Sequence, residues 1–408
     1  MKRERSTASP DRHPRTPVAA RTSDGPTRRA YLLPALGALA LPALLAVAGC
    51  RSEGDPGPQV VSTDDPRAVY MCPPCHVHED LFMDADGVCP VCGMALIERP
   101  DSSQVGRIHI HPGSGNFLLE GGPGHPEKLI QVFYHRPEGF TSRSPFVVVV
   151  PGAGRDADEY RDAWIDASER SGVLVLSPKY RESEYGFGAY HMGGLMEELN
   201  LSESVLREEG SNRAHLDEDR FDYRVNPDRE EWIFNDFDRL FVGVARAVGS
   251  DRESYDLFGH SAGGQILHRL VLFYPESRAD RILAGNAGFF TLPDTALDLP
   301  FGIGNTTVTE EDLDRSLGRR LVLFLGEEDD ETETGGTLLR SPTVDRQGLH
   351  RLERGRSFYA AGRALAERRS VPFAWELEVV PDVGHDFAAM SRAAAEYLYG
   401  DSRAEEGS

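Results

Sequence analysis

The chain has 408 residues, of which 40% are hydrophobic and 27% are charged, with 41 glycines and 27 prolines, so it can form one large domain or two moderate ones. This composition excludes a fully disordered, a collagen-like or a coiled-coil protein. The 44 basic and 66 acidic side chains give a formal net charge of -22 without any strong basic cluster, so we expect no nucleic-acid partner.

Residues 1–50 have the pattern of a bacterial export signal. The pair Arg28-Arg29 precedes an apolar stretch, residues 30–48, which contains two prolines and ends at Gly49-Cys50. The segment around the arginines resembles the twin-arginine motif, and residues 47–50 resemble a lipobox, which implies that Cys50 is acylated and becomes the new N-terminus. The alternative is an uncleaved anchor, but a stretch broken by two prolines spans a bilayer poorly. We therefore expect an exported lipoprotein of the cell envelope, held to the membrane by lipid on its periplasmic or extracellular face.

Four further cysteines follow a segment, residues 51–67, whose Gly, Pro, Ser and Asp content predicts a flexible linker. They form two C-x-x-C pairs within residues 68–98: Cys72, Cys75, Cys89 and Cys92. Two such pairs can bring four thiolates onto one tetrahedral ion. Residues 70–96 resemble the small heavy-metal-binding domain found beside copper and heavy-metal efflux components, most clearly in the run from Gly87 to Met94.

The identity of the bound ion stays open. Four thiolates favour one structural Zn(II), whereas the Met and His ligands of the similar family, with Met94 and His76 or His78 nearby, favour Cu(I). Two disulfides are the alternative in an oxidising compartment, although a bridge across two residues is strained. A redox role for the C-x-x-C pairs is less favoured, because no βαβ pattern surrounds them. Residues 97–105 have little to bury, so we expect the metal-binding module to fold separately, with few contacts to the rest and no part in catalysis.

From about residue 106 to residue 400, short apolar runs alternate with amphipathic stretches, which predicts an α/β domain with a mainly parallel sheet. The expected strands are residues 107–111, 129–135, 146–150, 173–176, 254–258, 281–284, 321–325 and 373–380. The expected helices are residues 156–170, 228–248, 262–273 and 351–368. His109 and His111 would then form one polar face of the first strand.

The segment Gly259-His-Ser261-Ala-Gly263 lies between an expected strand and an expected helix. Strand, G-x-S-x-G and helix form the context of a nucleophile elbow, in which small residues avoid collision with the facing backbone. A glycine-rich helix start that binds an anion is the alternative. The pattern predicts that Ser261 is a catalytic nucleophile.

A nucleophilic serine needs a base and an acid that orients the base. His385 follows the last expected strand, and Asp329 follows the strand before it, with Asp330 as the alternative acid. The order Ser261, Asp329, His385 is that of the α/β-hydrolase superfamily, and this chain resembles that superfamily over most of residues 106–400. The resemblance implies a doubly wound, mostly parallel sheet.

Other histidines are weaker candidates for the base. His260 lies inside the elbow and is expected to point away from the nucleophile. The remaining ones are expected to lie on the surface or in packed positions: His191, His268 and His350.

The oxyanion of the reaction needs two backbone donors, which we expect at Ala262 and at Ala153. Ala153 belongs to Pro151-Gly-Ala-Gly-Arg155, which resembles the H-G-x-G segment of the superfamily, although an ordinary strand-to-helix turn would contain the same glycines. Between residues 180 and 231 lies a polar insertion whose aromatic residues could form the substrate surface or pack in a loop.

The sequence as a whole predicts a lipid-anchored serine hydrolase that cleaves a small or polymeric ester and needs no catalytic cofactor, fused to a module that binds one ion. The general layout is similar to the polyhydroxybutyrate depolymerase and feruloyl esterase branch. The alternative is a metal-handling envelope protein whose hydrolase fold is catalytically silent, but no member of the expected triad is missing. A metallohydrolase is disfavoured because four protein ligands leave the ion no position for water.

Overall fold

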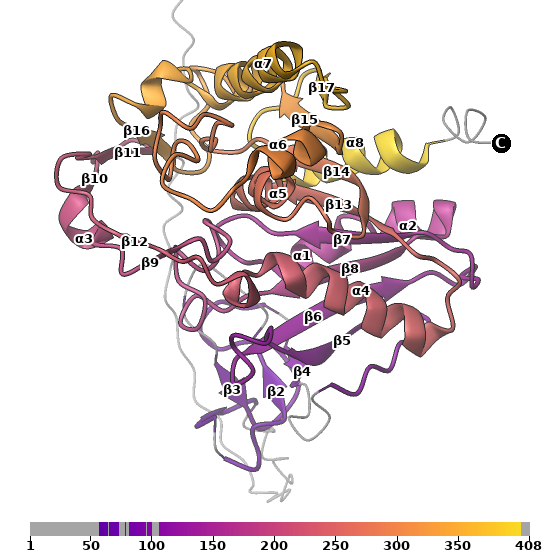
Figure 1. Ribbon diagram of the computed structural model, residues 1–408. Coiled ribbons are helices and arrows are strands. Elements are labelled where there is room, and N and C mark those ends of the chain that lie inside the picture. Colours follow the sequence, from indigo (N-terminus) through magenta and orange to yellow (C-terminus); the bar gives the residue numbers. More distant parts are fainter. Residues whose placement is uncertain are drawn as a thin grey trace, which may run out of the picture. The chain divides into compact units, whose positions relative to one another are not determined.

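Figure 1 shows a computed structural model of the chain, which describes residues 57–63, 65–72, 78, 81–94, 96–99 and 106–400. The export signal, Cys50 and Cys75 lie outside the described residues. Within the described ranges, no helix has the length and the apolar character needed to cross a bilayer.

A single eight-stranded sheet forms the centre of the hydrolase part. Its strands in spatial order are β17 (Glu376–Val380), β15 (Arg320–Gly326), β14 (Ala279–Gly285), β13 (Tyr255–His260), β7 (Phe146–Val150), β8 (Leu174–Lys179), β6 (Leu129–Arg136) and β5 (Gly113–Glu120). Strand β6 runs antiparallel to both of its neighbours, and the other adjacent strands are parallel. This sheet confirms the predicted fold class, an α/β-hydrolase with a mostly parallel sheet.

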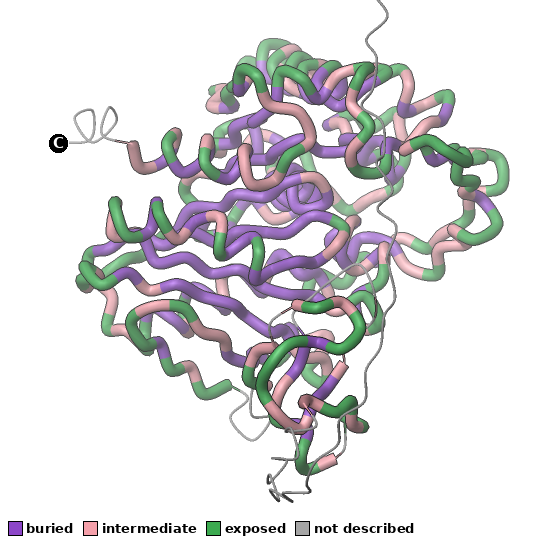
Figure 2. The backbone as a smooth tube through the Cα atoms, turned by 180° about the vertical axis from the view of Figure 1, so that it is seen from behind, coloured by how far each residue is buried: buried purple, intermediate pink, exposed green. Residues whose placement is uncertain are grey.

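Helices cover both faces of the sheet. One face packs against α4 (Phe234–Val248), α5 (Ala262–Phe273), α6 (Glu310–Leu317) and α7 (Arg351–Arg369), and the other against α1 (Ala157–Asp162), α2 (Ile165–Ser171) and α8 (Phe387–Tyr399). Alternate residues of β7 belong to the two hydrophobic cores, Val148 to one and Val149 to the other. A strand covered on both faces needs apolar residues at every position, and Figure 2 shows these buried strands through the middle of the molecule.

The structure corrects several sequence expectations. Residues 107–111 pair with no strand, and the first strand of the large sheet is β5, whose Gly115 lies so close to the Tyr134 ring that a side chain would collide with it. The alternation of Ile108 and Ile110 therefore reflects packing against the core and not a strand. The helix expected at residues 156–170 is two helices, α1 and α2, and neither α6 nor α8 was among the expected helices.

The insertion after β8 contains short elements that extend over the site. They are β9 (Met196–Glu197), α3 (Leu201–Ser204), β10 (Val205–Arg207), β11 (Arg213–Leu216) and β12 (Arg224–Val225). Strand β11 pairs in parallel with β16 (Leu338–Arg340), which follows the loop after β15. The insertion is thereby tied to the segment that precedes α7.

The module, here residues 57–99, forms a small antiparallel sheet in the order β1 (Val60–Val61), β3 (Phe82–Met83), β2 (Tyr70–Met71) and β4 (Ile97–Glu98). The separate folding of the module stays a prediction, and the module belongs to the same compact unit as the hydrolase part. Met71 is fully buried, and its sulfur accepts a hydrogen bond of 3.6 Å from the Gln131 side chain of β6. The buried apolar side chains of the module pack with one another, in two small clusters made of module residues.

Candidate active site and metal site

Ser261 lies in a sharp turn between β13 and α5. Its backbone has φ 58° and ψ -113°, in the left-handed half of φ that a non-glycine residue rarely adopts. A Cβ on Gly259 would come within 2.5 Å of the Gly263 backbone, and one on Gly263 within 2.1 Å of the Val150 carbonyl oxygen. Both glycines of G-x-S-x-G are thus required by close backbone approach, as the sequence analysis predicted.

The three residues of the expected triad form one hydrogen-bonded chain. His385 Nε2 lies 3.1 Å from Ser261 Oγ, and His385 Nδ1 lies 2.7 Å from Asp329 Oδ2. Asp330, the alternative acid, instead accepts hydrogen bonds from the backbone and hydroxyl of Thr332. The geometry therefore favours Asp329, which follows β15, as the partner of the imidazole.

Electrostatics keep the acid charged and the base neutral. Burial acts to raise the pKa of Asp329, but the hydrogen bond from His385 and the charge of Arg351 outweigh it and hold that pKa below its usual range. Burial lowers the pKa of His385, against the opposing hydrogen bond to Asp329, and the charge of Arg351 lowers it further. A neutral imidazole beside a serine hydroxyl can accept the hydroxyl proton.

Arg351 is a site residue that sequence reasoning missed. Its guanidinium Nη1 donates to Asp329 Oδ1 at 2.9 Å and Nη2 donates to the Gly335 carbonyl at 3.0 Å, and both charged side chains are at most 2% exposed. Glu333 adds a further contact, because its carboxylate accepts from the His385 backbone N–H at 2.6 Å. Position 351 is one of several arginines in an expected helix, so no sequence signal distinguished it.

The loop after β7 is positioned for an oxyanion hole. A Cβ on Gly152 would lie 2.9 Å from the Tyr160 hydroxyl oxygen, which is too close, and 3.5 Å from the Ser261 Cβ, so the loop lies beside the nucleophile. The Arg155 guanidinium, 3.8 Å from the centre of the Tyr190 ring, donates to the carbonyl of Tyr180 at 2.7 Å and thereby fixes the end of the loop. Ala153 lines the cavity in front of Ser261.

The other expected donor is at the start of α5. Ala262 is the first residue of that helix, where backbone N–H groups have no acceptor within the helix. The arrangement can place two N–H donors on one oxygen, which is what an oxyanion requires.

Two of the other histidines, His260 and His268, have packing roles, with one correction. His260 does not point away from the site: its ring centre lies 4.6 Å from that of His385, and its Nδ1 lies 3.2 Å from the Tyr160 hydroxyl. His268 is buried and contacts the Gly264 carbonyl and the Thr291 N–H. Neither touches Ser261 by a hydrogen bond, so His385 is the candidate base.

Two cavities meet at Ser261. The open cavity, of about 1290 Å³, extends from His385 past the loop at Gly152 and Lys179 to residues of the module. The apolar cavity, of about 460 Å³, lies under the insertion and is lined by side chains such as Leu216 and Phe289.

The aromatic residues of the insertion divide between the two roles that the sequence left open. Tyr185 and Tyr190 are buried packing residues, whereas Phe187 and His191 line both cavities.

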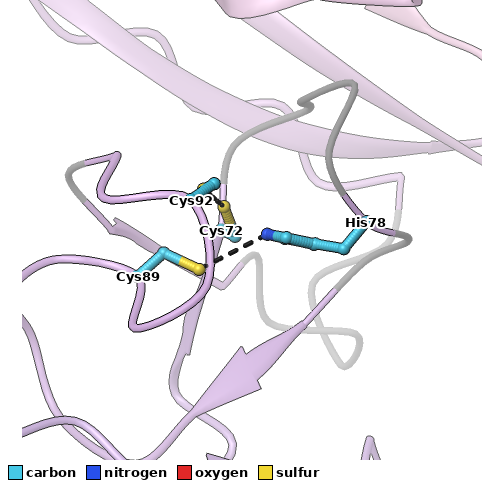
Figure 3. Close-up of side chains that lie close together, drawn as sticks. All are labelled: Cys72, His78, Cys89 and Cys92. Carbon is cyan, nitrogen blue, oxygen red and sulfur yellow. Dashed lines mark hydrogen bonds between the residues drawn. The ribbon is translucent and has the colours of Figure 1, made fainter.

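The module holds a second group of side chains, which we call the Cys/His cluster: Cys72, His78, Cys89 and Cys92. Figure 3 shows their side chains pointing toward one another. One ligand atom from each residue lies within 4.8 Å of the others. The sequence named Cys75 as the fourth ligand. That residue lies outside the described ranges, and among the described residues His78 supplies the fourth ligand atom.

The spacing of the cluster fits a metal ion. The sulfurs of Cys72 and Cys92 are 3.3 Å apart, and the Cys89 sulfur lies 3.4 Å from His78 Nε2. A tetrahedral zinc with ligand distances of about 2.0–2.3 Å has edges of roughly 3.3–3.8 Å. Cys72 and Cys89 are free thiols, so neither forms the disulfide that the sequence allowed. The Cys/His cluster can therefore hold a metal ion.

The thiol of Cys89 is prepared for metal binding by its backbone surroundings. Burial acts to raise its pKa, but hydrogen bonds from the backbone N–H groups of Cys92 and Val91 lower it to about 7. The Cys89 N–H donates to the Met94 carbonyl at 2.8 Å, and the Gly93 N–H returns to the Cys89 carbonyl at 2.8 Å. These bonds form the tight turn that the second C-x-x-C pair predicted.

Comparisons with solved structures place this fold among known enzymes. The chain is 34% identical to poly(aspartic acid) hydrolase-1 from Sphingomonas sp. KT-1, over 71% of this chain and 100% of that one, with a TM-score of 0.60. It is 29% identical to the poly(3-hydroxybutyrate) depolymerase LpqC from Bordetella parapertussis, over 72% of this chain and 91% of that one, again with a TM-score of 0.60. No protein-family model and no curated protein matches the sequence.

Three observations indicate the same family: the eight-stranded sheet, the strained turn at the serine and the extent of these similarities. The chain belongs to the α/β-hydrolase family of serine hydrolases, together with poly(aspartic acid) hydrolase-1. It is a serine hydrolase.

Proposed function

We propose that this protein is an exported, lipid-anchored hydrolase of carboxylic esters that acts through Ser261, His385 and Asp329. The single observation that carries the proposal is the hydrogen-bonded chain of these residues at a strained turn, open to a large cavity. An isolated surface serine has neither the base nor the buried acid that this arrangement supplies.

In the proposed reaction, His385 takes the proton of Ser261 as the serine oxygen attacks the ester carbonyl. The N–H groups of Ala262 and Ala153 stabilise the oxyanion, and Asp329 stabilises the imidazolium that forms. His385 then gives the proton to the leaving alcohol, which leaves an acyl group on the serine. Water, deprotonated by the same imidazole, releases the acid and restores the enzyme.

The two cavities support an ester with a long or polymeric chain. The open cavity is larger than the 300–1000 Å³ or so that is usual for a small-molecule site. The apolar cavity beside Ser261 can hold the acyl part, while the open one holds the rest of the chain. The depolymerase from Bordetella parapertussis acts on a polymeric ester by its name, which supports the same substrate class here.

We further propose that the Cys/His cluster binds one structural Zn(II). Three thiols and one imidazole form a usual structural zinc set, in which four protein ligands leave no open position. Cu(I) is the alternative, because thiolates also suit that ion. The ion would supply stability to the module, and no step of ester cleavage passes through it.

Anchoring at Cys50 rests on the lipobox-like residues 47–50, as does the envelope location. The membrane would then hold the enzyme by acyl chains joined through residues 51–67.

The test of the proposal is covalent labelling with a fluorophosphonate, followed by mapping of the modified residue. We expect modification at Ser261, and we expect Ser261→Ala to lower kcat for p-nitrophenyl acetate on the order of 10⁴-fold. A folded Ser261→Ala protein with full turnover, or a label on another residue, would show that the assignment is wrong.

The alternative, an envelope metal-handling protein with a silent hydrolase scaffold, predicts no such labelling. The intact contact of His385 with both Ser261 and Asp329 argues against it, because a chain that has lost catalysis does not need to keep a strained serine backbone.

A further inference from the structure

The module forms part of the wall of the substrate cavity. Thr63, His78 and Phe82 line the open cavity together with Ser261 and His385. The sequence assigned the module no role at the site, because residues 97–105, which join it to the hydrolase part, do not indicate any contact between the two. The module is therefore placed to contact a substrate that extends beyond the ester bond.

The cavity wall and the Cys/His cluster share their supporting structure. His78 belongs to both, since it lines the cavity and its Nε2 lies 3.4 Å from the Cys89 sulfur. Phe82 lies on β3. The residue that precedes Phe82 is Leu81, whose carbonyl accepts a hydrogen bond of 2.9 Å from the Cys72 N–H. A change in the cluster is thus transmitted to the wall through one residue or one backbone hydrogen bond.

The described residues of the module bury few apolar side chains. Its apolar side chains form two small clusters, one around Ala68, Met71 and Phe82 and the other around Met83 and two of the cysteines. Its strands have two residues each. Segments of this size usually need a metal or a disulfide to stay folded, so a bound ion would stabilise the wall.

We propose that the ion bound by the Cys/His cluster fixes one wall of the substrate cavity, so that ion content controls how the extended part of an ester chain is held. The proposal rests on the function proposed above for Ser261 and extends it. The ion acts on substrate positioning and not on bond cleavage, since the triad contacts no residue of the cluster by a hydrogen bond in the described part of the chain.

The test uses two fluorophosphonates that label Ser261, a small ethyl ester and one that carries a long poly(ethylene glycol) chain. Thr63→Trp adds bulk to an exposed wall residue outside the cluster, and we expect it to slow labelling by the long probe at least 5-fold while labelling by the small probe changes less than 2-fold. Val60→Trp is the matched control, because Val60 is 49% exposed in the same small sheet and does not line the cavity.

The role of the ion is tested by stripping it from full-length wild type and Thr63→Trp with a chelator and restoring it with zinc alone. We expect stripping to release the block in Thr63→Trp, and zinc to restore it. Limited proteolysis of both proteins gives a readout apart from labelling: residues 57–99 should become sensitive on stripping, while the hydrolase part stays resistant.

Each contrary result has its own meaning. Equal slowing of both probes, or of neither, by Thr63→Trp would overturn the claim that the module contacts the extended part of the substrate. A block that persists after stripping, with residues 57–99 still resistant, would overturn the role of the ion. Failure of both probes to label wild-type Ser261 would instead refute the proposed function.

Discussion

Replacing Arg351 by methionine removes the positive charge behind the acid of the triad. The side chains of Arg351 and Asp329 are 2% and 1% exposed. They form an ion pair in which Arg351 Nη1 lies 2.9 Å from Asp329 Oδ1. Methionine keeps much of the apolar volume of the arginine side chain but cannot donate a hydrogen bond to Asp329. The carboxylate then keeps its hydrogen bond with His385.

The loss of stability follows from the burial of the pair. Breaking a buried ion pair by removing one partner costs about 3–5 kcal/mol. An unfolding entropy of about 2.1 cal/mol/K per residue gives roughly 0.6 kcal/mol/K for about 300 residues, so Tm should fall by about 5–8 °C. Differential scanning calorimetry measures this change. Arg356→Met is the matched control, because Arg356 is exposed on the same helix, α7, and we expect its Tm to stay within about 1 °C.

The pH profile gives a second, independent readout. The charge of Arg351 lowers the pKa of His385, and removal of that charge should raise it. Because the base must be neutral to act, kcat/KM rises with pH through this pKa. The acid limb of the profile should therefore lie below pH 6.5 or so in the wild type and move to higher pH in Arg351→Met. An unchanged acid limb in a folded variant would refute the electrostatic reasoning, even if Tm falls.

Three further predictions follow from the site and the signal. Asp329→Asn should lower kcat for p-nitrophenyl acetate about 10⁴-fold, while Asp330→Asn should change it less than 2-fold, and the reverse order would move the acid to position 330. Gly263→Ala should lower both Tm and kcat, because the new methyl group would lie 2.1 Å from the Val150 carbonyl oxygen; a variant with wild-type melting and turnover would contradict this close approach. Cys50→Ser should abolish metabolic labelling with palmitate, and label that persists would place the anchor elsewhere.

The chemistry of the site could be predicted from sequence wherever local pattern alone specifies it. The strand ending at His260 and the helix starting at Ala262 are local elements, and the glycines between them are required by the turn itself. His385 and Asp329 follow parallel strands, and the carboxyl ends of parallel strands meet at one edge of the sheet. Residue type and position in the chain were therefore sufficient to predict that Ser261, Asp329 and His385 lie together.

Contacts between distant segments were decided only by the tertiary structure. Arg351 reaches Asp329 because α7 begins beside the loop after β15, and nothing in a run of arginines indicates which one is buried. Thr63 lines the cavity in front of Ser261, and the module contacts β6 through Met71, although nothing in the sequence links these segments. The hydrophobic effect favours burial of apolar surface whatever partner covers it. The sequence therefore determined which side chains must be buried, and only the tertiary structure determined which segments bury them.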